Sequence, residues 1–397
     1  MTRRGRLTLA LGCLLYAAAW LLGARTLYPV AIGLVAGALA AALWVRAARR
    51  PASVSRRAGR DVQLEGDDVT LVLRAEMTRG LRPAVLSVTE RLGRLGDHRI
   101  RLTPHGGFAT GRTTLRRVPR GRYAFTGASA TVDDPFGLAR RESPVRDGGA
   151  LLVHPRLVQL AGLFTESGTR GAGGRRLFLR RPSGFDFHGV REHQQGESLR
   201  RVHWPSTAKR GALMVKDFED APRDELAILL DATAAPAGPS FDVQVRAAGS
   251  LLRAFATAGR SSLLALNRVP PEYHHVASER DWHAAYDALA AAEPDGNTPA
   301  AALLGAEGGP LARVGELVVV TAAVPRALAD RLLERASGGR RVALVLVDAG
   351  SFAGRSAVPT ADLLRLSAAG VAVAVAASGD DLARVLGDRP LRAAARA

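Results

Sequence analysis

The residues best suited to chemistry follow an apolar run in the second half of the chain. Asp231 comes directly after "LAILL" at 226–230, a buried-strand pattern, and Thr233 follows two residues later. In an open α/β sheet, the carboxyl ends of the parallel strands form the edge where ligands bind. A carboxylate and a hydroxyl at that edge are hard oxygen ligands of the kind that Mg²⁺ takes. The pattern therefore indicates one candidate metal site.

The turn after this run resembles the start of a von Willebrand factor A-type domain, whose metal turn reads Asp-x-Ser-x-Ser. The resemblance implies that Asp231 and Thr233 would bind a divalent cation together with oxygen ligands from neighbouring loops. The third position of the turn is Ala235, which has no ligand atom, and the later run "ELVVVTAA" places Thr321 where such domains often have an aspartate.

A hard cation takes about six oxygen ligands, so we expect the site to be degenerate and to hold no metal or other cofactor. Asp231 then caps the next turn or pairs with an arginine. The alternative function is that of a Mg²⁺-dependent ligand-binding or hydrolytic protein that uses Asp231 and Thr233.

The residues that other metal sites or a nucleophilic active site would need are not found in the sequence. His188, His193 and His203 have no spacing typical of zinc ligands. Cys13 is the only cysteine, which excludes an intrachain disulfide and a cysteine-rich metal site. No Gly-x-Ser-x-Gly motif is present. We therefore predict that the protein is not an enzyme.

A second group of candidate residues lies in the basic segment 189–220. Its members are Arg191, Gly196, Glu197, Arg200, Arg201, Trp204, Lys209 and Arg210. We expect Arg191 to pair with Glu197 across a turn, and Trp204 to cover an arginine stem through a cation–π contact. Pro205 is expected to end any helix that begins at Ser198. The alternating residues that follow predict a strand at the edge of a sheet.

Two roles remain open for this segment. It is either a structural clamp between the two folded parts of the chain or a docking surface for an acidic face of a partner protein, and both can hold together. Lys209 and Arg210 are the cations that we expect to be most exposed.

The same segment resembles the signature of a bacterial family, domain of unknown function 58, which reads Arg-x-Tyr-x-x-Gly-Asp-x-x-Arg-x-Ile-x-Trp. The positions that fill this register are Arg191, Gly196, Glu197, Arg200, Arg201 and Trp204, with His193 in place of the usual aromatic residue. "DPFGL" at 134–138 resembles part of the family's β-region. The resemblance implies a membrane-tethered scaffold with a von Willebrand factor A-like domain. It also implies partner proteins such as a MoxR-type AAA+ ATPase and a transglutaminase-like membrane protein.

Two apolar runs, at 7–24 and 28–45, are each just long enough to cross a bilayer as a helix. A signal peptide is the competing interpretation, but the second run follows at once and no small-x-small cleavage site separates them. Arginines flank the pair at Arg3, Arg4, Arg6, Arg46, Arg49 and Arg50, whereas the turn has only Arg25. The positive-inside rule then predicts a multi-pass protein of the cell membrane whose soluble parts are cytoplasmic.

The hydropathy pattern predicts a multidomain α+β protein. Residues 1–50 form a transmembrane helical hairpin and 51–60 a basic linker. Short alternating runs at 61–160 predict an antiparallel β-sandwich-like domain, and 161–224 form a connector that holds the family signature. Apolar strands alternate with helices over 225–397, which predicts a doubly wound α/β domain of von Willebrand factor A type.

The net charge of +18 first suggests an acidic partner such as nucleic acid. Lys209 and Lys216 are the only lysines, however, and a chain rich in arginine, alanine and glycine is typical of a GC-rich genome. Aromatic residues make up 5% of the chain, so the stacking platforms of single-strand binders are sparse. We expect the partners to be the lipid bilayer and other proteins, and not nucleic acid.

Overall fold

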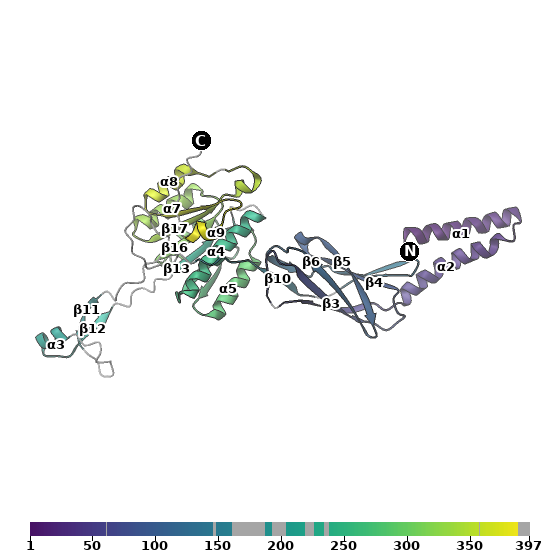
Figure 1. The fold of residues 1–397 in the computed structure, drawn as a ribbon, viewed down its shortest axis with the longest axis horizontal. Helices are drawn as coiled ribbons and strands as arrows, with labels where there is room; N and C mark the ends of the chain where they lie inside the picture. Colours follow the sequence, from purple (N-terminus) through teal and green to yellow (C-terminus); the bar gives the residue numbers. More distant parts are fainter. Residues whose placement is uncertain are drawn as a thin grey trace. The chain divides into compact units, whose positions relative to one another are not determined.

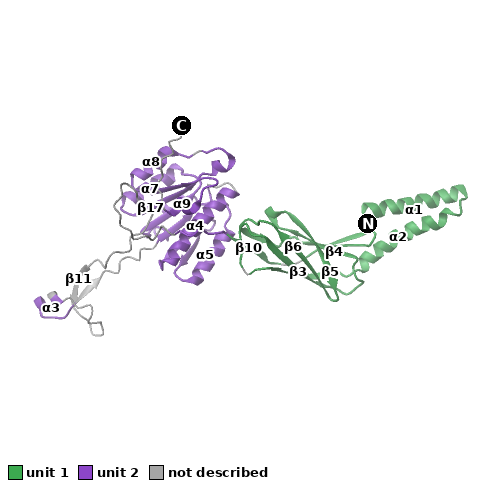
Figure 2. Cartoon of the chain, in the orientation of Figure 1, with its two compact units in different colours: residues 1–154 green, residues 155–397 purple. Residues whose placement is uncertain are grey.

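The computed structural model describes residues 1–60, 62–145, 148–160, 187–192, 204–218, 226–233, 238–356 and 358–387, with the backbone alone for 187–192, 205, 206 and 215–218. The chain divides into two compact units, residues 1–154 and 155–397 (Figure 2). Unit 1 contains a helical hairpin and a β-domain. Unit 2 contains an α/β domain and a small β-hairpin.

The hairpin of unit 1 consists of α1 (Arg3–Leu22) and α2 (Leu27–Ala47), and both helices are long and apolar enough to cross a membrane. These two helices confirm the apolar pair expected from the hydropathy pattern. Small residues are buried at every seventh position. They are Gly5, Gly12 and Ala19 on α1, and Ala31 and Ala38 on α2. Gly12 lies against α2, whereas Gly5 lies against Leu138 of the β-domain. A methyl group on Gly12 would lie 2.8 Å from the Val35 side chain, so small residues let the two backbones approach closely.

The β-domain consists of two sheets. Seven strands in the order β1-β3-β6-β5-β4-β8-β9 form an antiparallel sheet, and β2-β10-β7 form a smaller one in which β2 and β10 are parallel. The strands are β1 (Pro51–Ala58), β2 (Gln63–Leu64), β3 (Val69–Met77), β4 (Val85–Arg91), β5 (Asp97–His105), β6 (Phe108–Leu115), β7 (Gly121–Ala124), β8 (Ser129–Asp133), β9 (Arg140–Pro144) and β10 (Ala150–His154). Residues from both sheets share one hydrophobic core, which includes Leu73, Val88, Tyr123 and Val153.

The prediction of a linker at 51–60 is wrong. Strand β1 pairs antiparallel with β3 along its length and so forms one edge of the large sheet. Val54 faces the core, and Arg56 is buried with it because its guanidinium binds the carboxylate of Glu90 at 2.7 Å. The guanidinium also lies 5.0 Å from the centre of the Phe125 ring. A strand whose inward positions include an arginine does not show the apolar alternation that identifies a strand in sequence.

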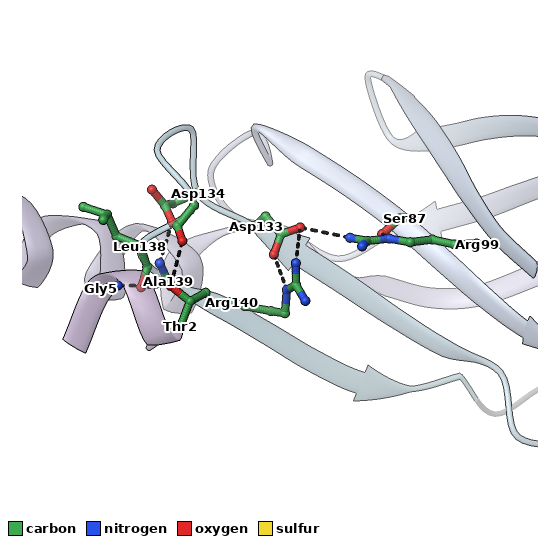
Figure 3. A network of polar contacts seen from close by, with 10 residues as sticks. Thr2, Gly5, Ser87, Arg99, Asp133, Asp134, Leu138, Ala139 and Arg140 are labelled. Atoms are coloured by element: carbon green, nitrogen blue, oxygen red, sulfur yellow. Dashed lines mark hydrogen bonds and ion pairs between the residues drawn. The ribbon is translucent and has the colours of Figure 1, made fainter. Parts of the chain in front are cut away.

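The amino end of α1 and the carboxyl end of α2 together form what we call the foot of the hairpin. This foot contacts the loop 134–139 of the β-domain (Figure 3). The Thr2 amide donates a hydrogen bond to the Leu138 carbonyl at 2.9 Å. A side chain on Gly5 would collide with that same carbonyl, because an added Cβ would lie 2.0 Å from its oxygen. Ala139 is buried with Ala41 and Val45 of α2. The two helix ends that leave the hairpin therefore meet at this loop.

Unit 2 has a six-stranded sheet in the order β15-β14-β13-β16-β17-β18, in which only the edge strand β15 is antiparallel. Its strands are β13 (Leu226–Leu230), β14 (Ser262–Leu266), β15 (Glu272–Val276), β16 (Glu316–Thr321), β17 (Arg341–Val347) and β18 (Ala372–Ala376). Its helices are α4 (Pro239–Thr257), α5 (Glu279–Ala291), α6 (Ala300–Gly305), α7 (Arg326–Ser337), α8 (Thr360–Ala368) and α9 (Leu382–Gly387).

Helices cover both faces of this sheet (Figure 1). One core contains side chains of α4, α5 and α9, such as Phe255, Leu289 and Leu386. The other contains side chains of α6, α7 and α8, such as Leu303 and Leu332. The predicted α/β architecture is confirmed. The chain moves outward from β13 to β14 and β15 and then returns to β16 on the other side of β13, so the strand order reverses between β13 and β16.

The β-hairpin of unit 2 consists of β11 (Phe187–Glu192) and β12 (Met214–Phe218), which pair antiparallel. The predicted strand exists as β12, but it pairs with β11 and not with the edge of the large sheet. Pro205 is the second residue of α3 (Trp204–Arg210). Residues 193–203, where a helix from Ser198 would lie, are outside the described residues, so the role expected of Pro205 stays a prediction. A proline is tolerated in the first helical turn, since its missing N–H would have no partner in the helix.

Candidate functional site

The polar residues at the carboxyl ends of the central strands form one hydrogen-bonded network. Asp231 follows β13, Asn267 follows β14 and Thr321 ends β16, so the network lies where the strand order reverses. All three residues are buried, with Asp231 only 2% exposed. This is the position where open α/β sheets bind ligands.

Three residues donate hydrogen bonds to the carboxylate of Asp231. Its Oδ1 accepts hydrogen bonds from the Thr233 amide at 3.1 Å, the Thr233 hydroxyl at 2.6 Å and the Asn267 side-chain amide at 2.6 Å. Its Oδ2 accepts from the Thr321 hydroxyl at 2.9 Å. The bond from the Thr233 amide is the turn-capping contact expected of Asp231, and the four hydrogen bonds above all come from neutral groups.

The Asn267 side chain is oriented by its other contacts. Its Oδ1 accepts from the Ala232 amide at 2.7 Å, and its amide group also donates to the Thr298 carbonyl at 3.0 Å. The amide nitrogen must therefore face Asp231. The N–H group of Asn267, which carries partial positive charge, thus contacts Oδ1 of Asp231. A cation that binds Asp231 would have to approach this same carboxylate.

A loop closes over the turn that follows Asp231. A Cβ on Gly296 would lie 3.0 Å from backbone atoms of Ala232, Thr233 and Asn267. Arg268 holds the start of this loop, since its guanidinium binds the Asp295 carboxylate at 2.9 Å. This hydrogen bond raises the pKa of Arg268 above its usual value.

These contacts indicate a structural role for the Asp231 network. Asp231 contributes the network's carboxylate, whereas Asn267 and Thr321 contribute an amide and a hydroxyl. Among the residues that the structure describes, no group of three or more His, Cys, Asp or Glu side chains is arranged to bind a metal ion. The site joins three strands and their loops by hydrogen bonds.

Sequence reasoning missed Asn267 and Gly296. Asn267 directly follows the apolar run 262–266, so the rule that identified Asp231 also applies to it. Gly296 lies in the sequence "PDGN", which looks like an ordinary surface turn. Its close approach to two other loops has no local signature.

The second candidate site lies on α3. Trp204 is 67% exposed, and Lys209, Arg210 and Leu213 are exposed as well. The Thr207 hydroxyl accepts a hydrogen bond from the Met214 amide at 3.0 Å and so joins the helix to β12. Gly211 adopts a φ of 68° in the turn between them. The structure therefore places Trp204, Lys209 and Arg210 on one short helix, Trp204 in its first turn and the two cations in its last.

The other residues of the family signature are only partly described. Arg191 lies in β11, paired with Val215 of β12. Four signature residues lie outside the described residues, namely Gly196, Glu197, Arg200 and Arg201. The expected pairing of Arg191 with Glu197 and the contact of Trp204 with an arginine stem stay predictions.

Comparison with known proteins identifies no family. No family model matches the chain. A segment of 239 residues is 27% identical to the uncharacterized protein YeaD of Bacillus subtilis (strain 168), and it covers 58% of this chain and 57% of that protein. A comparison with solved structures finds Cwp6 from Clostridium difficile, with a TM-score of 0.18 and 10% identity over 82% of this chain and 49% of the other. The chain thus spans a little over half the length of this curated relative.

Proposed function

We propose that the protein is a membrane-anchored, non-catalytic adaptor whose folded units face the cytoplasm. The observation that carries this proposal is the foot of the helical hairpin. The amino end of α1 and the carboxyl end of α2 both contact the loop Asp134–Ala139 of the β-domain. If α1 and α2 cross the bilayer, the β-domain lies at the surface from which both helices emerge.

The arginine distribution supports the cytoplasmic orientation. Six arginines lie within a few residues of the foot, at positions 3, 4, 6, 46, 49 and 50, whereas the turn between the helices has one, Arg25. Positively charged flanks are retained on the cytoplasmic side of a membrane. The same orientation places unit 2 in the cytoplasm, because no further apolar helix of spanning length follows in the part of the chain that the structure describes.

The resemblance to domain of unknown function 58 and to von Willebrand factor A-type domains supports the adaptor role. An open α/β sheet with helices on both faces agrees with such a domain, and the neutral donors around Asp231 favour binding without a metal ion. The partners that we propose are those that the resemblance implies. They are a MoxR-type AAA+ ATPase and a transglutaminase-like membrane protein.

We propose α3 as the docking surface for the acidic face of a partner protein. Trp204 offers a large exposed aromatic surface, and Lys209 and Arg210 supply charge on the last turn of the same helix. Aromatic and arginine side chains dominate the binding energy of many protein interfaces. Thr207 couples this helix to β12, so the surface is presented on a defined element.

Charge reversal on α3 tests this surface. We expect the variant Lys209→Glu with Arg210→Glu to reduce recovery of a copurifying ATPase or membrane protein at least about tenfold, since like charges facing each other cost more than 1 kcal/mol. The measurement is quantitative mass spectrometry of proteins recovered with the full chain from detergent-solubilised membranes. Arg365→Glu with Arg384→Glu is the control, because these exposed arginines lie on α8 and α9. Equal recovery with all three proteins would contradict the docking role of α3.

A further inference from the structure

We infer that the loop Asp134–Ala139 is a third membrane contact, in which Phe136 enters the headgroup region of an anionic bilayer. The inference rests on the proposed membrane anchor and adds a lipid-binding surface to the β-domain. Phe136 is 78% exposed, the highest value among the large apolar side chains that the structure describes.

The loop is rigid although its tip is exposed. The buried Asp134 carboxylate accepts a hydrogen bond from the Phe136 amide at 2.8 Å. It accepts another from the Ala139 amide at 2.6 Å (Figure 3). Gly137 completes the turn with a φ of 70° and donates its amide to the Asp134 carbonyl. A tightly bonded loop that exposes a phenylalanine loses little conformational freedom when the ring is buried by a partner.

The position of the loop identifies that partner as the bilayer surface. Thr2 donates its hydroxyl to the Gly137 carbonyl at 2.7 Å, and Gly5 lies against Leu138. The apolar run of α1 begins at Leu7, two residues or about 3 Å of helix rise beyond Gly5. On α2, the contacts with Ala139 come from Ala41 and Val45, at the end of the apolar run. The loop is therefore level with the hydrocarbon boundary at both helices.

The charges around the loop fit an anionic surface. Exposed arginines adjoin it at Arg3, Arg4 and Arg6 on α1, Arg46 on α2 and Arg140 on β9. The two acidic groups at the start of the loop are already engaged, because Asp134 binds backbone amides and Asp133 binds Arg99 and Arg140. Glu142, on β9, is exposed. The hydrogen bond to Asp133 raises the pKa of Arg140. An aromatic wedge with basic neighbours is the composition of interfacial membrane contacts.

Depth-dependent quenching tests the inference on the full chain. In a Cys13→Ser background, Phe136→Cys and Val62→Cys each carry one environment-sensitive fluorophore. Val62 is also exposed but lies just before β2, in the other sheet of the β-domain. The wild-type chain labelled at Cys13, within the apolar run of α1, reports the anchor. The proteins are reconstituted in vesicles of phosphatidylglycerol and phosphatidylethanolamine whose acyl chains are brominated near the headgroup or near the bilayer centre.

We expect lipids brominated near the headgroup to quench position 136 several-fold more than position 62, and lipids brominated near the centre to quench Cys13. Equal quenching at 136 and 62, with Cys13 still quenched, overturns the lipid contact and leaves the anchor intact. An unquenched Cys13 overturns the anchor itself. Labelling of the cysteine at position 136 could be blocked in native membranes but not in vesicles that contain only this protein and lipid. That result would also overturn the inference, since another protein would then cover the loop.

Discussion

Replacing Asp231 with alanine is expected to destabilise unit 2 by about 3 kcal/mol without removing any metal binding. The carboxylate is buried and accepts four hydrogen bonds, from Thr233, Asn267 and Thr321. Its removal leaves donors of three loops with fewer partners, and each unsatisfied buried group costs about 1–3 kcal/mol. Urea unfolding of the full chain in detergent measures the change, with the fluorescence of the buried Trp282 as the probe.

Two control variants distinguish the loss of the Asp231 hydrogen bonds from the loss of one negative charge. Thr233→Ala removes one side-chain donor and should cost about 1 kcal/mol. Asp380→Ala removes an exposed carboxylate that accepts from the Ala377 amide after β18, and it should change stability by less than about 1 kcal/mol. An Asp231→Ala protein of unchanged stability would contradict the structural role. Saturable Mg²⁺ binding by the wild type that this substitution abolishes would favour the metal-dependent alternative.

Replacing Glu90 with alanine is expected to destabilise the β-domain by about 3–5 kcal/mol, the cost of breaking a buried ion pair by removing one partner. The side chains of Arg56 and Glu90 are 3% and 1% exposed. The substitution leaves the Arg56 guanidinium buried without this carboxylate, beside the ring of Phe125. Pulse proteolysis of the full chain in urea measures the loss, followed by the fragments from residues 51–154.

The double variant Arg56→Met with Glu90→Leu is the matched control, because it removes both charges and fills the space with apolar groups. It should recover most of the lost stability, since apolar replacements of buried pairs are often neutral. A double variant as unstable as Glu90→Ala alone would show that the ion pair does not account for the effect. The result also tests the assignment of 51–58 as an integral strand.

The sequence predicts the elements whose side chains alternate or repeat with a clear period. Five strands of the large sheet of unit 2, β13, β14, β16, β17 and β18, and the two helices at the amino end follow from apolar runs in the sequence. Strand β15 has the sequence "EYHHV" and shows no such run. Strand β1 does not follow, because its inward-facing Arg56 depends on Glu90, which lies 34 residues away. Long-range ion pairs of this kind leave no periodic signal.

The candidate sites, too, have features that the sequence predicts and features that depend on the folded structure. The position of Asp231 at the ligand edge follows from the apolar run before it. Its four hydrogen-bond donors, however, belong to Thr233, Asn267 and Thr321, which only the folded sheet brings together. Pro205 lies in the first turn of α3, a position that proline tolerates and that sequence reasoning did not consider. The exposure of Trp204 and Phe136 depends on tertiary packing, so composition does not indicate it.

Protease accessibility in spheroplasts tests the central claim most directly. The full chain carries an epitope tag after Ala397, and protease is added to intact spheroplasts and to spheroplasts opened with detergent. The account predicts that the tag and both folded units are protected until the membrane is opened. Cleavage beyond residue 50 in intact spheroplasts, with a cytoplasmic marker still protected, would contradict the proposed orientation and with it the adaptor function.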